Sequence, residues 1–143
     1  MKWYEKCLLE LTHHNMFESS GHRDRFLDLT SCYYSAPFLS KGLCKCMYQS
    51  SWDEEHFGVM LDTLNDLIIG GDKNVKSMTE QGSVLSQQLT GYDAEIYKLS
   101  TAFLADTEYP LPDFTTMDPD GAYIIRKALL AGRYIDDLPD PTP

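Results

Sequence analysis

Basic residues are scarce in this chain of 143 residues. It has 12 Lys and Arg against 22 Asp and Glu, which gives a formal net charge of −10 at pH 7. Nucleic acids and anionic membrane surfaces attract proteins through clustered Lys and Arg side chains, and the sequence has no such cluster. We therefore expect a protein that binds neither nucleic acid nor membranes. The acidity serves solubility alone, a basic surface on a partner, or mimicry of DNA.

Long hydrophobic runs are missing as well. No stretch approaches the roughly 18 consecutive apolar residues that a membrane-spanning helix needs. The first twelve residues carry charges among their apolar positions and lack the cleavage site of a signal peptide. We expect a cytoplasmic protein whose four cysteines are reduced thiols. Strand patterns are also absent, because no segment alternates apolar and polar residues between hairpin turns.

Helical periodicity dominates instead. Apolar residues from Phe57 to Ile68 recur at the spacing of a helix face, with Ser51 and Glu54 placed as a capping box before them. The pattern predicts a helix over about 52–69. Similar patterns predict further helices over about 2–14, 22–34, 38–48, 78–89, 92–105 and 119–136, the last of them opened by Asp118 and Pro119.

The sequence therefore predicts an all-α fold, a compact bundle of six or seven short helices. Residues 1–137 are expected to form a single domain, and residues 138–143 a flexible C-terminal tail. Residues 106–117 contain two prolines and predict an irregular connection of about a dozen residues. Connections of that length are often functional.

Two cysteines one residue apart, Cys44 and Cys46, raise the question of a metal or redox site. Side chains two positions apart on a helix project about 200° from each other, so they cannot chelate one ion. Zinc thiolates usually come as C-x2-C on a turn. We expect Cys46 to pack on the apolar face with Met47 and Cys44 to lie toward the other side. Cys7 and Cys32 are expected to be lone helix residues.

The histidines give no stronger signal. His13 and His14 are adjacent, so on a helix they diverge by about 100°, while His22 and His56 lie elsewhere. The sequence contains no H-E-x-x-H motif, no G-x-S-x-G motif and no phosphate-binding loop. We therefore predict no catalytic residue, no metal ligand and no cofactor.

One family resemblance is present. The run FESSGHRDRF at 17–26, followed by Tyr33-Tyr34 and by residues 52–57, resembles a family of small helical proteins from Firmicutes. Members of that uncharacterised family are often encoded on conjugative or phage-like elements, and residues 118–137 are similar to theirs as well. The resemblance implies a bacterial cytoplasmic protein with an accessory role on a mobile genetic element. It brings no activity and no functional residue.

We expect an interaction module without catalytic activity, a mobile-element accessory or counter-defence protein that binds a host protein. Aromatic side chains are enriched at interface hot spots, although each can equally serve core packing. Two acids at the end of a predicted helix are either a patch for a basic partner or simply solvated. The candidate contacts are Tyr33, Tyr34, Tyr48, Trp52, Tyr109, Phe114, Asp136 and Asp137.

Two other functions remain open at this level. One is a small Cys/His-dependent enzyme or metal-binding protein. The other is self-association, because the apolar face from Phe57 to Ile68 could pair with its own copy in a homodimer.

Overall fold

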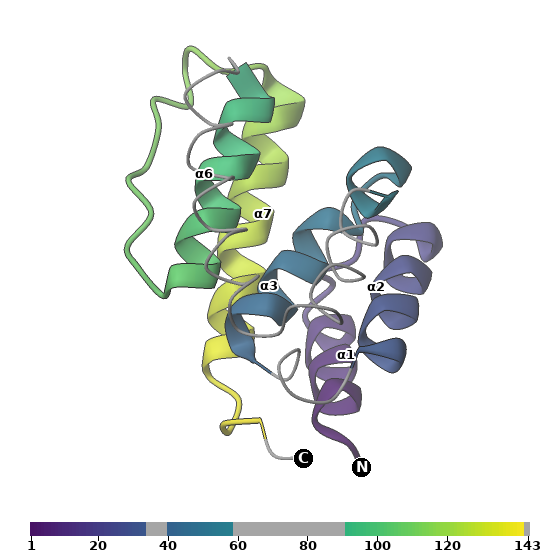
Figure 1. Ribbon diagram of the computed structural model, residues 1–143. Coiled ribbons are helices and arrows are strands. Elements are labelled where there is room, and N and C mark those ends of the chain that lie inside the picture. The colour runs from purple at the N-terminus through teal and green to yellow at the C-terminus, as the bar shows by residue number, and fades with distance from the viewer. Residues whose placement is uncertain (34–39, 59–90, 142–143) are drawn as a thin grey trace.

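The computed structural model describes residues 1–33, 40–58 and 91–141, which contain helices and no strand and so confirm the predicted all-α fold (Figure 1). A helical segment also covers residues 54–58, at the edge of a described range. None of the helices in this part of the chain has the length and apolar composition needed to cross a membrane. Five helices are assigned within these ranges: α1 (Trp3–His13), α2 (Ser20–Cys32), α3 (Lys41–Ser50), α6 (Gly91–Ala105) and α7 (Pro119–Asp136).

Local signals in the sequence place several of these helix ends. The side chains of Ser19 and Ser40 accept hydrogen bonds from the first turns of α2 and α3. Asp118 accepts from the backbone N–H of Gly121 at 3.3 Å and Pro119 follows it, which confirms the predicted opening of α7. The helix predicted over 78–89 and most of the one predicted over 52–69 lie outside the described residues.

The predicted capping box at Ser51 is wrong. The backbone N–H of His56 donates to Asp53 Oδ1 at 2.8 Å, so Asp53 caps the helical segment that begins at Glu54. Ser51 instead follows α3 directly, and its hydroxyl donates to the carbonyl of Met47. The spacing of Ser51 and Glu54 predicted a capping box wrongly because Ser51 is the C-terminal cap of the preceding helix, α3.

The central element of the fold is α3. It contacts α2, α6 and α7, and Figure 1 shows it between the α1–α2 pair and the α6–α7 pair. All eight residues from Leu43 to Ser50 are buried. Cys44 is therefore buried together with Cys46, and the two side chains face different neighbours, as predicted. The Cys46 thiol donates to the carbonyl of Ser100 on α6, whereas Cys44 lies beside Cys7 on α1. Because α3 is covered on all sides, its polar side chains need partners inside the protein, and Gln49 Nε2 donates to the carbonyl of Ile96 at 3.1 Å.

A glycine allows α3 and α6 to approach closely. A Cβ atom at Gly42 would lie 2.4 Å from the carbonyl oxygen of Phe103. That distance is far inside van der Waals contact, and the clashing atom belongs to the backbone of α6 rather than to a flexible side chain. Position 42 therefore requires glycine for steric reasons.

The carboxyl end of α7 is fixed by α1 and α3. Lys41 Nζ donates to the carbonyls of Asp136 at 2.9 Å and Leu138 at 2.6 Å, which supplies positive charge where the helix dipole is negative. Trp3 Nε1 donates to the carbonyl of Pro139 at 2.8 Å. The first residues of the segment predicted to be a flexible tail are thus bonded to two helices.

A histidine occupies the core between α2 and α3. His22 is fully buried, its Nε2 donates to the carbonyl of Tyr48 at 3.0 Å, and its Nδ1 accepts from the backbone N–H of Glu18 at 3.2 Å. This pairing uses both nitrogens of a neutral ring. Burial lowers the pKa of His22 to about 4.

We predict that Gly42→Ala destabilises the protein by about 1–3 kcal/mol, because the added methyl group forces the α3 and α6 backbones apart. Gly58→Ala is the matched control, since no atom of the described residues lies within 4 Å of its Cβ position. The control should be neutral or stabilising by up to about 1 kcal/mol. Urea denaturation measures both, and equal stability of the two variants would contradict the close approach.

We also predict an acid-sensitive core. The unfolded chain binds a proton at His22 near pH 6.5, whereas the folded protein resists it until about pH 4, so stability is complete above pH 6.5 and falls below it. Between pH 7 and pH 5 the loss from this group is about 2 kcal/mol. Denaturation curves at both pH values should show this loss in the wild type and in His13→Gln, whose imidazole is exposed. His22→Gln should abolish most of it, and an unchanged slope in that variant would contradict the assignment.

Candidate interaction groove

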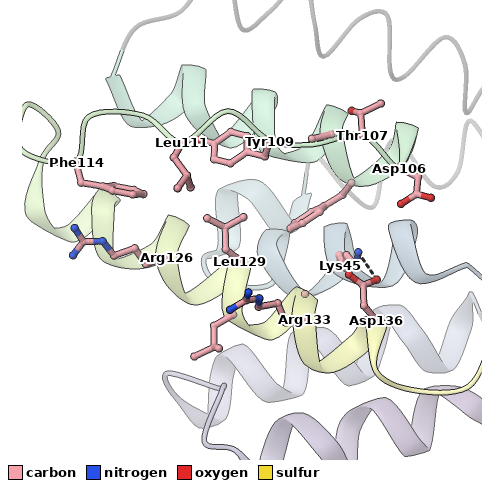
Figure 2. Close-up of a pocket in the computed structure, with 14 residues that line it drawn as sticks. Lys45, Asp106, Thr107, Tyr109, Leu111, Phe114, Arg126, Leu129, Arg133 and Asp136 are labelled. Carbon is pink, nitrogen blue, oxygen red and sulfur yellow. Dashed lines mark ion pairs between the residues drawn. The ribbon is translucent and has the colours of Figure 1, made fainter.

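A groove of about 600 Å³ lies between α6, α7 and the irregular segment 106–118 (Figure 2). We call it the interaction groove. In Figure 2, Phe114 and Arg126 lie at one end, and Lys45, Asp106 and Asp136 lie at the other. Its apolar lining is largely aromatic and aliphatic: Phe103, Tyr109, Leu111, Phe114, Leu129 and Leu130.

The wall formed by segment 106–118 begins with a defined helix end. Asp106 has a positive φ of 54°, its N–H donates to the carbonyl of Phe103, and the N–H of Thr107 donates to the carbonyl of Ala102. This pair of bonds is a Schellman motif, which turns the chain sharply out of α6. Asp tolerates the left-handed conformation better than most residues other than Gly. The segment therefore leaves α6 in one fixed direction and returns along the groove.

Two further contacts hold this wall. The Tyr109 hydroxyl donates to the Glu95 carboxylate on α6. The pKa of the phenol is raised, mainly by burial and to a smaller extent by the negative charge of Glu95. The ring of Phe114 lies under the guanidinium of Arg126, 4.5 Å from centroid to Cζ. The predicted irregular connection is therefore anchored at both ends of its course.

A lysine from α3 closes the other end of the groove. Lys45 Nζ lies 2.6 Å from Asp136 Oδ1 and 5.4 Å from the centroid of the Phe103 ring. The Lys45 side chain is 9 % exposed, so its positive charge is nearly buried and is compensated by the Asp136 carboxylate. The Asp136 carboxylate is thus engaged with a cation rather than presented alone.

The structure separates the predicted contact residues into different places. Tyr109, Phe114 and Asp136 come together in the interaction groove. Trp52 is half-buried in another cluster, 5.1 Å from the ring of His22, and Tyr33 is half-buried at the end of α2. Asp137 is exposed directly after α7, and Tyr34 lies outside the described residues.

Tyr48 is wrong as a partner contact. Its side chain is 1 % exposed, and its hydroxyl donates to the carbonyl of Met16 inside the core. The physical reason is the complete burial of α3, which leaves none of the residues from Leu43 to Ser50 facing solvent.

Sequence reasoning missed the two arginines of the groove and its two exposed leucines, Leu111 and Leu130. Arg126, Leu130 and Arg133 lie at positions i, i+4 and i+7 of α7, and such residues share one helix face. The spacing was available in the sequence. Leu111 gave no signal, because a leucine in an irregular segment has no periodicity to place it.

Two of the cysteines, Cys44 and Cys46, are buried in the core. Among the described residues, no group of three His, Cys, Asp or Glu side chains could hold a metal ion. The Cys7 thiol on α1 is a neighbour of the Cys44 thiol, and interaction with Cys7 followed by burial raises the pKa of Cys44. Burial raises the pKa of Cys46 to about 12. Cys44 and Cys46 are therefore protonated, poorly nucleophilic thiols near neutral pH.

We predict that Tyr109→Phe destabilises the protein by about 1–2 kcal/mol, because it removes a partly buried hydrogen bond to the Glu95 carboxylate. Tyr123→Phe is the matched control: its hydroxyl also donates to a carboxylate, that of Glu18, but at an exposed site. The control should lose less than about 1 kcal/mol. Urea denaturation gives both values, and hydrogen exchange should show faster opening near Leu111 only in Tyr109→Phe. Equal losses in both variants would contradict an anchoring role for Tyr109.

In comparisons with known proteins, no family model, no curated protein and no solved structure matches this chain. The chemistry and shape of the interaction groove are therefore the basis on which function can be argued.

Proposed function

We propose that this protein is an interaction module without catalytic activity, and that it binds a partner protein in the interaction groove. The observation that carries the proposal is the position of Leu111. Its side chain is 70 % exposed although the segment that bears it is anchored on both sides, through Tyr109 and through Phe114. Exposed apolar side chains gathered in one groove mark an interaction site, and Leu130 of α7 is exposed in the same lining.

The composition of the lining supports the same function. Protein interfaces are enriched in Tyr, Phe and Arg, and the groove presents Tyr109, Phe114, Arg126 and Arg133. Leu130, 39 % exposed on α7, adds a second apolar side chain at the rim. Aromatic anchors with arginines beside an apolar floor are the arrangement in which a few residues supply most of the binding free energy.

The charged and polar groups of the groove favour binding over catalysis. Neither His nor Cys is among its lining residues. Lys45 is held by Asp136, and burial raises the pKa of Tyr109 further above neutral pH, so its phenol is a still weaker acid. A nucleophile or general base needs a partner that activates it, whereas Lys45 is held in an ion pair and the pKa of Tyr109 is shifted away from neutral pH.

The resemblance of residues 17–26 to the family of mobile-element proteins suggests a biological setting for the proposed interaction. On that basis the partner is a host protein, and the module is an accessory or counter-defence protein of the element.

We predict that the double variant Leu111→Ser/Leu130→Ser loses the partner. Immobilised wild-type protein, incubated with a lysate of its bacterial host, should retain a partner that the double variant retains at least about ten-fold less, because each leucine buries apolar area on binding. Leu9→Ser is the matched control, since Leu9 is 55 % exposed on α1, outside the groove lining. Mass spectrometry quantifies the retained proteins. Recovery of nothing above background, or equal recovery by the double variant, would contradict the proposal.

A further inference from the structure

The interaction groove is locally basic in an acidic molecule. The whole chain carries a net charge of −10, yet the described residues that line the groove include three cationic side chains, Lys45, Arg126 and Arg133, and two anionic ones, Asp106 and Asp136. Since Lys45 and Asp136 neutralise each other, the two arginines of α7 dominate the rest of the lining. The groove therefore differs in sign from the surface around it.

The two arginines are available to a ligand. Within the described part of the chain, neither Arg126 nor Arg133 forms an ion pair. Arg126 is positioned instead by the ring of Phe114, over which its guanidinium lies. Stacking on an aromatic face leaves the N–H edge of a guanidinium free, and that edge matches a carboxylate in a bidentate pair.

The spacing of these groups fits a helix. Arg133 lies seven positions after Arg126 in α7. At 1.5 Å per residue this spacing is about 10.5 Å along the helix axis, or about two turns. The apolar side chains of Leu129 and Leu130 lie between them in sequence, with Phe114 on the facing wall (Figure 2). A helix lying along α7 would thus meet apolar contacts at its centre and a cation near each end.

We propose that the partner segment is an acidic amphipathic helix. Its apolar face lies in the groove, and two of its carboxylates, about seven residues apart, pair with Arg126 and Arg133. This inference rests on the proposed function and specifies the chemistry of the partner. Charge complementarity selects this occupant, because the unpaired cations of an otherwise acidic protein repel a basic segment and leave a neutral one with desolvated arginines.

The test is a selection of peptides on the full-length protein. A phage library of 16-residue peptides is enriched on the wild type and depleted on Leu111→Ser/Leu130→Ser, so that only groove binders remain. The enriched peptides should carry Asp or Glu seven or eight positions apart around apolar residues. Fluorescence anisotropy with such a peptide should show an affinity about five-fold lower for Arg126→Gln and for Arg133→Gln.

Arg23→Gln is the matched control, because it removes the same charge from an exposed arginine on α2 and should leave the affinity unchanged. Two results would overturn the proposal of an acidic partner helix and leave the proposed function standing. One is the enrichment of groove-dependent peptides that lack Asp and Glu. The other is a peptide that binds Arg126→Gln as tightly as it binds the wild type. Enrichment of no groove-dependent peptide would overturn both. A dimer that light scattering detects in the wild type but not in the leucine double variant would place a second copy in the groove and overturn the inference.

Discussion

The complete burial of α3 is the constraint on which the rest of this structure depends. A helix covered on every side must satisfy its own polar groups from its neighbours, and Lys45 and Gln49 do so on α7 and α6. The neighbours are then fixed in distance as well as direction, because the backbone at Gly42 meets the Phe103 carbonyl without an intervening side chain. Any shift of α3 would break an ion pair and a buried hydrogen bond together.

The interaction groove is a consequence of this packing. Helices α6 and α7 contact each other and both lean on α3, and the segment that joins them crosses the open side as a wall. Because Lys45 comes from α3 and lines the groove, the central helix contributes directly to the surface proposed for binding. The floor is therefore rigid, and the wall carries the exposed Leu111. Such a groove is preorganised, which reduces the entropy lost on binding.

Local signals in the sequence predicted the helices well, and nonlocal packing explains what they missed. Asp118 and Pro119 were sufficient to place the start of α7, because a cap acts within one turn. The burial of Cys44 and Tyr48 could not be predicted, since periodicity identifies one apolar face and α3 has no open one. Tyr109 and Phe114 were predicted as contacts from a long connection with aromatic residues. The spacing of Arg126 and Arg133 was visible, but arginines on a helix are usually solvated, and only the fold shows the groove beside them.

The distribution of charge has a consequence for how a partner would be recognised. At physiological ionic strength the field of the whole chain is screened beyond about 8 Å, so the net charge of −10 gives only weak repulsion of an acidic partner at a distance. In the proposed complex Arg126 and Arg133 would act at contact, next to apolar side chains of the groove lining that the partner would cover. The proposed acidic segment would therefore meet little repulsion as it approaches, and it would gain favourable electrostatic energy only on reaching both arginines. Selectivity of this kind resides in the lifetime of the complex rather than in its rate of formation.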